Sequence, residues 1–357
     1  MAFYIGLFII SVLLVMISQK DNTAKIGYLI LWFVYAFRDK VSVDDSGYIS
    51  AFEKINLGWK FDVEWSYQAL SKFASSIGLN YKFVFFVYAT VSFVFLIKAV
   101  DLLFETNAKK GFYLACFYGT IFVTAMSVMR QFLAACICFY AIVSYLKRKS
   151  FKCSAFLIGL AVIIHGGAIV ALPLLLICRF QGKLSYSKKI LIMILCIVGG
   201  YGNIVGNILR IGMRFLPASY QLYSNAISGS YSSAGGTVSI ILALMFLLQC
   251  FISYRAGVDY PQNEEVDVLE FGQLLYLGLL FLFVRAGVAN RLSITFIPFI
   301  ASLPYTFSLR VRENQRKMIW FVFVVAMLIL YVMSIKQTAT IYKGTFIPYQ
   351  WSFDFKG

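Results

Sequence analysis

The sequence is poor in charged residues. Only 13% of its 357 residues are Asp, Glu, Lys or Arg, whereas 61% are hydrophobic and 18% are aromatic. A soluble domain carries about 25% charged residues, because its surface must be polar. The shortage of charge therefore excludes a soluble globular enzyme, a disordered chain and a secreted disulfide scaffold. An integral membrane protein remains. We expect it to be mainly helical, because lipid tolerates no unpaired backbone polar groups.

The sequence also lacks the motifs of several common enzyme and transporter classes. It contains no P-loop, no HExxH and no GxSxG, so ATP-driven transport and hydrolytic zinc chemistry have no support. His165 is the only histidine, and the seven cysteines form no CxxC pair. A single histidine cannot build a typical zinc site without acidic or cysteine partners, so we expect no metal and no cofactor.

Apolar runs that are long enough to span a bilayer, or nearly so, follow one another along the chain. They predict an all-α polytopic membrane protein with about twelve transmembrane segments, forming one integral membrane domain over residues 1–357. Several runs are short and require tilting or local thinning of the bilayer. The runs are Ala2–Ile17, Ala24–Phe37, Phe83–Phe104, Phe112–Met126, Gln131–Leu146, Phe151–Ile164, Ala168–Ile177, Ile190–Val205, Val238–Tyr254, Leu269–Val284, Leu292–Phe307 and Met318–Met333.

Two long segments, residues 38–82 and 207–237, connect some of these runs. Amphipathic stretches of the first, such as Ser66–Ile77, predict helices lying at the interface. Lys and Arg in the short loops favour an orientation with both termini outside, so both long segments are expected to be outer loops. Between Phe151–Ile164 and Ala168–Ile177 we expect a break at His165, because paired glycines and a histidine disrupt a helix in lipid. One continuous span there would invert everything that follows.

The net charge is +16, from 32 Lys and Arg against 16 Asp and Glu. In a soluble protein such an excess would suggest a nucleic-acid partner. In this chain no basic run stands clear of an apolar segment, and basic loops set topology and contact anionic lipid. We therefore expect membrane lipid as a partner and no nucleic acid.

Arginines of the predicted outer side lie at or near the ends of apolar runs. Arginine suits bidentate contact with phosphate in a partly dry site, and charges at membrane depth are costly and by default mark function. The alternative is an anchor whose charge extends to the lipid headgroups. The arginines in question are Arg38, Arg130, Arg210, Arg214, Arg285 and Arg291.

Other polar residues of the outer side suggest acid–base chemistry and sugar binding. Asp44 beside a group of arginines is a plausible general base, or else an ordinary solvated loop acid. His165 is a base or hydroxyl-orienting residue, or else a structural hydrogen bonder. The dense aromatic residues of the outer loops, Tyr48 and Tyr67 among them, stack on sugar rings or form an interfacial aromatic belt.

Five short elements resemble, in the same order, the motifs of the EpsG-like branch of Wzy polysaccharide polymerases. The segment from Phe37 to Phe52 resembles the FRxxVGxDYxxYxxxF signature, although Ser42 stands at the Gly position and Asp45 at the first Tyr position. The other elements are Glu64-Trp65-Ser66-Tyr67 for "E-P-x-Y", Arg130-Gln131-Phe132-Leu133-Ala134 for "R-Q-x-L-A", His165-Gly166-Gly167-Ala168 for "H-x-S/G-A", and the late pair Arg285 and Arg291.

The resemblance implies a function and a fold. Proteins of this kind join repeat units of O antigen, capsule or exopolysaccharide on the outer face of the bacterial inner membrane, and their fold is similar to that of membrane C-type glycosyltransferases. Donor and acceptor are oligosaccharides linked to undecaprenyl diphosphate, and undecaprenyl diphosphate is released. A chain-length regulator is a further candidate partner. A flippase for the lipid-linked oligosaccharide and an O-antigen ligase remain as alternatives.

The resemblance also assigns roles to the candidate residues. The six arginines would bind diphosphate groups, and Arg130 would in addition stabilise the leaving group by fixed positive charge. Asp44 or His165 would take the proton of the acceptor hydroxyl. The residues that would bind the sugars are Tyr48, Glu64, Tyr67 and Gln131.

Overall fold

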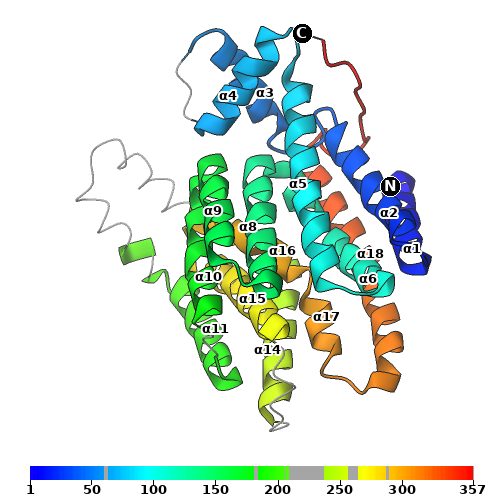
Figure 1. The fold of residues 1–357 in the computed structure, drawn as a ribbon, viewed down its shortest axis with the longest axis vertical. Coiled ribbons are helices and arrows are strands. Elements are labelled where there is room, and N and C mark those ends of the chain that lie inside the picture. Colours follow the sequence, from blue (N-terminus) through cyan, green and yellow to red (C-terminus); the bar gives the residue numbers. More distant parts are fainter. Residues whose placement is uncertain are drawn as a thin grey trace. The chain divides into compact units, whose positions relative to one another are not determined.

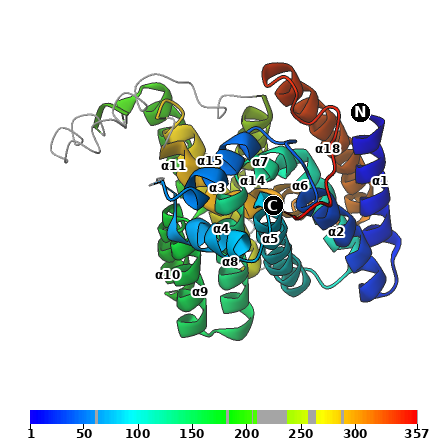
Figure 2. The same cartoon turned by 90° about the horizontal axis from the view of Figure 1, so that it is seen from above.

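The computed structural model describes residues 1–59, 63–180, 184–204, 206–208, 237–255, 264–286 and 289–356. The regular elements of these ranges are all helices, accompanied by two isolated β-bridges (Figure 1 and Figure 2). The all-α prediction is therefore confirmed. The chain forms two compact units: unit 1 is Met1–Ile169 with Lys317–Gly357, and unit 2 is Val170–Arg316. The single membrane domain over the whole chain stays a prediction.

Unit 1 is a helical bundle around α8, which is buried along most of its length because small and large apolar residues occupy every face. α8 packs between α5 and α9, while α1 packs against α2 and α6. The helices are α1 Ala2–Ile17, α2 Asp21–Ala36, α3 Asp45–Asn56, α4 Trp65–Ser76, α5 Tyr81–Leu103, α6 Asn107–Thr120, α7 Phe122–Ser127, α8 Met129–Arg148, α9 Phe151–Ile164 and, from its second turn onward, α18 Glu313–Ile341.

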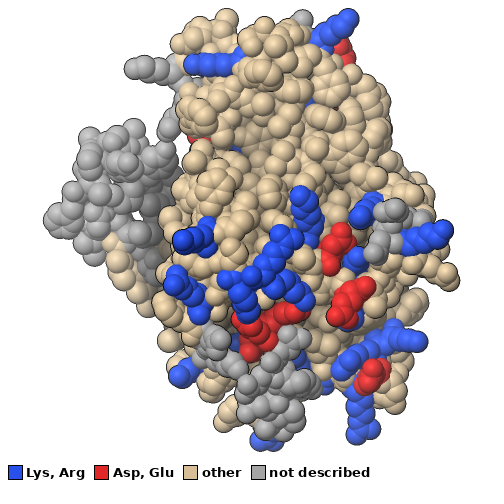
Figure 3. Space-filling view, viewed as in Figure 1, with Lys and Arg blue, Asp and Glu red and all other residues tan. Residues whose placement is uncertain are grey.

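Four helices in the described part of the chain are long and apolar enough to cross a membrane: α5, α8, α14 (Thr237–Arg255) and α18. Shorter apolar helices accompany them, including α1 and α9. Residues other than Lys, Arg, Asp and Glu form most of the face drawn in Figure 3, as expected for a surface in contact with lipid. The chain is therefore a helical membrane protein, and the figure of about twelve spans stays a prediction.

One predicted span is divided in the structure. The run Leu292–Phe307 is distributed over a 3₁₀ helix, η3 (Ala289–Phe296), and two short α-helices, α16 (Ile297–Ile300) and α17 (Leu303–Ser308). Pro298 and Pro304 occupy the first turns of α16 and α17. Proline has no N–H and clashes with the preceding turn, so a proline is tolerated where a helix begins but not inside a continuous helix.

The residues after α18 form hydrogen bonds with several helix ends of unit 1. The Tyr4 hydroxyl at the start of α1 donates to the Phe346 carbonyl over 2.5 Å, and Ser352 N–H donates to Phe37 O, after α2, over 3.0 Å. Asn80 N–H, before α5, donates to Phe355 O over 2.9 Å. The start of α1, the end of α2, the start of α5 and the C-terminal segment (residues 342–356) therefore share one end of unit 1, which we call the strap end.

The expected break at His165 is confirmed. α9 ends at Ile164, His165 has extended backbone angles (φ −152°, ψ 116°), and the 3₁₀ helix η1 (Gly166–Val170) follows. The Ser66 hydroxyl at the start of α4 donates to Ile164 O over 3.4 Å. The break therefore places the end of α9 beside α4.

Unit 2 is built on α15 (Glu264–Leu282), which packs against α11 (Tyr186–Tyr201), η3 and α16. α10 (Ala171–Arg179) also contacts α15, and α14 packs against α11 and α17. α11 and α15 approach closely at Gly200, where a Cβ atom would lie 1.8 Å from the Phe281 carbonyl oxygen. Small residues at such crossings let two helix backbones pack at short range.

Replacing this glycine is expected to destabilise the protein. A Gly200→Ala methyl group meets backbone rather than a flexible side chain, so the helices must separate, which costs about 1–3 kcal/mol. Thermal unfolding of the purified protein in detergent should show a lower midpoint. Gly159→Ala in α9 is the matched control, because its Cβ would meet nothing within 4 Å. Equal midpoints for the two variants would contradict the close α11–α15 contact.

Candidate functional site

Three ionisable side chains at the ends of three helices meet at one place in unit 1. Glu64, immediately before α4, forms an ion pair with Arg130 of the first turn of α8. The other oxygen of the same carboxylate, Oε1, lies 2.5 Å from Nδ1 of His165 at the end of α9. All three side chains are partly buried, with 19%, 25% and 20% exposure for Arg130, Glu64 and His165. The structure therefore brings together two predicted catalytic residues and one predicted sugar-binding residue.

Glu64 leaves part of the Arg130 guanidinium unused. A guanidinium carries five N–H donors, and Nε of Arg130 is buried without a hydrogen-bond partner in the described part of the chain. The guanidinium carbon lies 5.3 Å from the centre of the Tyr48 ring and 5.7 Å from that of Tyr67. Two aromatic faces and one carboxylate thus hold the charge in place while donors remain for an anion.

The two tyrosines are neutral hydrogen-bonding groups in this site. Burial raises the pKa of Tyr48, and the charge and hydrogen bonds of Arg130 only partly oppose it. Burial likewise raises the pKa of Tyr67 well above its ordinary value. The Tyr67 hydroxyl donates to Tyr48 O over 2.7 Å, which joins α4 to α3. Both predicted sugar-binding tyrosines therefore lie beside Arg130.

A second ion pair holds the turn before α3. Arg38 and Asp45 are 1% and 0% exposed, and Arg38 Nε lies 3.2 Å from Asp45 Oδ1. Ser42 donates its hydroxyl to Oδ1 over 2.5 Å and its N–H to Oδ2 over 2.9 Å. Burial acts to lower the pKa of Arg38, but the charge of Asp45, followed by Tyr35 and Tyr349, outweighs it and the net pKa is raised. Arg38 is thus committed to Asp45 rather than to Asp44, which is half-buried at the N-cap of α3.

The remaining predicted residues lie elsewhere. Gln131 follows Arg130, is buried, and its Oε1 has no hydrogen-bond partner among the described residues. Arg285 is half-buried just after α15 and Arg291 is exposed in η3, both in unit 2. Arg210 and Arg214 lie outside the described residues. The diphosphate-binding roles of the arginines stay predictions.

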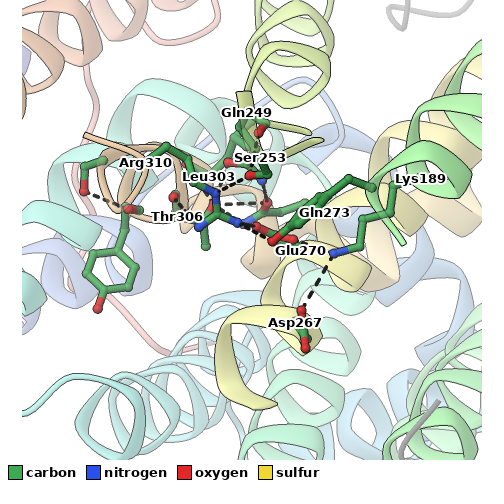
Figure 4. Close-up of polar contacts among 12 residues, drawn as sticks. Lys189, Gln249, Ser253, Asp267, Glu270, Gln273, Leu303, Thr306 and Arg310 are labelled. Atoms are coloured by element: carbon green, nitrogen blue, oxygen red, sulfur yellow. Dashed lines mark hydrogen bonds and ion pairs between the residues drawn. The ribbon is translucent and has the colours of Figure 1, made fainter. Parts of the chain in front are cut away.

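Unit 2 contains a buried charge network that the sequence analysis missed. Glu270 of α15 is 0% exposed and its two oxygens pair with Lys189 of α11, over 2.5 Å, and with Arg310 after α17 (Figure 4). Arg310 also donates to the Ser253 hydroxyl over 2.7 Å and to the Tyr186 hydroxyl over 3.1 Å. Glu270 is the one acid inside the predicted apolar run Leu269–Val284, and that position could have revealed it.

This network is fully paired, which indicates a structural role. A second layer continues it, in which Gln249, Gln273 and Thr306 exchange hydrogen bonds between α14, α15 and α17. Asp267, one turn before Glu270, lies 4.0 Å from Lys189 and is partly exposed. The loops that begin or end near this network are inner loops in the predicted topology, so the network would close the inner end of unit 2.

No group of three or more His, Cys, Asp or Glu side chains within the described ranges is arranged to hold a metal ion. The fold and the paired charges at helix ends define a polytopic helical membrane protein with a charged site at the end of a bundle. A family model matches residues 23–351, and the chain belongs to the EpsG family. That membership points to a polysaccharide polymerase type of role in membrane-bound polysaccharide biosynthesis. Comparisons with curated proteins and with solved structures find no significant match.

Neutralising Glu270 is expected to destabilise unit 2. Glu270→Gln leaves the buried Arg310 without its counter-charge and Lys189 with the more distant Asp267, and breaking such a network costs about 3–5 kcal/mol. Thermal unfolding should show this loss. Asp267→Asn removes the same charge three residues away at a partly exposed position, so its midpoint should stay close to wild type. A Glu270→Gln midpoint equal to that of Asp267→Asn would refute the structural role.

Proposed function

We propose that this chain joins oligosaccharides carried on undecaprenyl diphosphate, at a site built around Glu64, Arg130 and His165. The supporting observation is the shared Glu64 carboxylate, which holds a cation and an imidazole side by side. A lipid diphosphate requires fixed positive charge, and a sugar hydroxyl requires a base. Both groups are present within reach of one carboxylate.

The reaction needs one bond to form and one to break. A hydroxyl oxygen of the acceptor sugar attacks the anomeric carbon of the donor, and the bond from that carbon to the phosphate oxygen breaks. The electron pair leaves with undecaprenyl diphosphate, whose developing negative charge Arg130 stabilises through the donors that Glu64 leaves unused. The hydroxyl proton passes to a base. The charge of the leaving group is met by arginine, and no metal is invoked.

His165 is our preferred base. When its Nδ1–H donates to Glu64, Nε2 carries the lone pair and can accept a proton. The carboxylate then fixes the tautomer and stabilises the imidazolium that forms. Asp44 is the alternative base, because it lies at the start of α3, the helix that also carries Tyr48. Tyr48, Tyr67 and Gln131 would contact the sugars.

The proposal includes a location and a larger fold. The chain would cross the bacterial inner membrane about twelve times in an arrangement similar to membrane C-type glycosyltransferases, with the strap end of unit 1 facing the periplasm. Glu64, Arg130 and His165 would then stand where lipid-linked units become accessible after export. The apolar helix faces would admit the polyprenyl chains.

Removing the Arg130 charge is expected to stop polymer formation. Arg130→Gln loses the fixed cation, and loss of a comparable electrostatic stabiliser costs about 10²–10³-fold in rate. The measurement is mass spectrometry of undecaprenyl-diphosphate-linked saccharides in a deletion strain that expresses each variant at normal level. Single repeat units on the outer leaflet should accumulate. Lys72→Gln, an exposed lysine of α4, is the matched control and should restore full-length polymer.

Two outcomes would count against this assignment. Full-length polymer made by Arg130→Gln would remove Arg130 from the chemistry. Lipid-linked units confined to the inner leaflet of the deletion strain, protected from a hydrolase added to spheroplasts, would favour a flippase instead.

Two further variants separate the candidate bases. If His165 takes the proton, His165→Gln should lower the polymerisation rate by about 10²–10⁴-fold, while Asp44→Asn retains most of it. Rates are compared in membranes of equal protein content, with thermal unfolding as a check on folding. The reverse order would assign the base to Asp44. Equal rates for both variants and wild type would exclude both residues.

A further inference from the structure

A groove of about 380 Å³ lies in unit 1 between α3 and the C-terminal segment. One wall is a face of α3 together with the segment before it, and the other is the turn after α18. Val43 and Ile49 supply its apolar side chains. Its polar side chains are two lysines, four hydroxyl groups and one carboxylate, namely Lys40, Lys343, Ser42, Ser46, Ser50, Thr345 and Glu53. Its lining contains no aromatic ring.

The groove is separate from the Arg130 site, because α3 stands between them. Ser46, Ser50 and Glu53 are spaced i, i+4 and i+7 and therefore share one helix face. Tyr48, two residues from Ser46 and Ser50, lies on the opposite face and contacts the Arg130 guanidinium. A helix with its side chains is about 10 Å across, so a ligand of several sugar units could reach both sites.

Backbone hydrogen bonds hold the groove wall that is formed by the turn after α18. Phe346 N–H donates to Val41 O over 2.8 Å, and the Phe346 carbonyl accepts from Tyr4 over 2.5 Å. Gly344 has a φ of +87°, a conformation that few other residues adopt, and it turns the chain toward α3. The C-terminal segment is thus positioned by backbone contacts, which gives the groove a defined width.

The cations of the groove are unpaired. Neither Lys40 nor Lys343 forms an ion pair or a side-chain hydrogen bond among the described residues, whereas Arg38, Lys82, Lys110, Lys189 and Arg310 all do. Two ammonium groups against one carboxylate leave a net positive charge in the groove. Ammonium groups bind carboxylates and phosphates, and serine and threonine hydroxyls both donate to and accept from hydroxyl groups.

We propose that this groove binds an acidic segment of the saccharide, with Lys40 and Lys343 on its carboxylate or phosphate and the hydroxyls of α3 on its ring hydroxyls. This inference rests on the proposed polymerase function and adds a substrate class to it: repeat units that carry an anionic sugar. A lipid phosphate shares the anionic group but presents few hydroxyls to the row formed by Ser46, Ser50 and Thr345. The groove would hold the part of the saccharide that does not react.

The test measures binding of a soluble probe to the full-length protein in nanodiscs of uncharged lipid. The probe is a tetrasaccharide containing glucuronate, and the comparison probe is the same tetrasaccharide with its carboxyl groups reduced to alcohols. Lys40→Gln and Lys343→Gln should each weaken binding of the acidic probe by about five- to tenfold, since each loses one charge-assisted contact. Lys356→Gln is the matched control, an exposed lysine of the C-terminal segment outside the groove, and should bind within about twofold of wild type.

Several results would overturn the assignment. These are equal affinity of the wild type for both probes, no detectable binding of the acidic probe at about 10 mM, or unchanged affinity in both groove variants. Displacement of the probe by short-chain phosphatidylglycerol, lost in both groove variants, would assign the groove to lipid instead. The probe carries no lipid diphosphate, so its binding does not depend on polymerisation. Probe binding without polymer formation would refute only the proposed function, and polymer formation without probe binding would refute only the groove.

Discussion

A charged side chain that is removed from water costs several kcal/mol unless an opposite charge and hydrogen bonds replace its hydration. The protein has only 16 acidic residues against 32 Lys and Arg, so few carboxylates are present to balance its buried cations. Asp45 pairs with Arg38, Glu64 with Arg130 and His165, and Glu270 with Lys189 and Arg310. In each case the partners come from different helices or from a helix and the loop before it. The counter-charges therefore determine which helix ends meet.

Glu64 and Glu270 differ in burial and in how completely their ion-pair partners are hydrogen-bonded. Glu270 is fully buried and its network is closed by Ser253, Tyr186 and a layer of amides, so nothing in it remains for a ligand. Glu64 is partly exposed, and a buried Nε of its partner Arg130 has no hydrogen bond within the described residues. A polar group in that state is costly until a ligand satisfies it. The ion pairs of Glu270 are thus completed by further hydrogen bonds, whereas the ion pair of Glu64 leaves a buried donor of Arg130 unsatisfied.

Helix positions could largely be predicted from the sequence, because apolar runs and glycine pairs act locally. The run Ala2–Ile17 coincides with α1, and the break at His165 follows from its neighbouring glycines. The meeting of Glu64 with His165 could not be predicted, since the two are 101 positions apart and only tertiary packing joins α4 to α9. Glu270 was overlooked because its partners Lys189 and Arg310 lie 81 and 40 positions away along the chain. The roles of Arg210 and Arg214 stay predictions, since both lie outside the described residues.

The two departures from the family signature near α3 explain each other. Ser42 stands where the signature has glycine and Asp45 where it has tyrosine, and in the structure Ser42 donates two hydrogen bonds to the Asp45 carboxylate. That carboxylate also pairs with Arg38, so two substitutions that each look unfavourable together form one buried unit. Asp45 therefore balances the charge of Arg38, whose diphosphate-binding role stays a prediction. Glu64 balances the charge of Arg130 in the same way, and each of these two arginines keeps a buried nitrogen without a hydrogen-bond partner within the described residues.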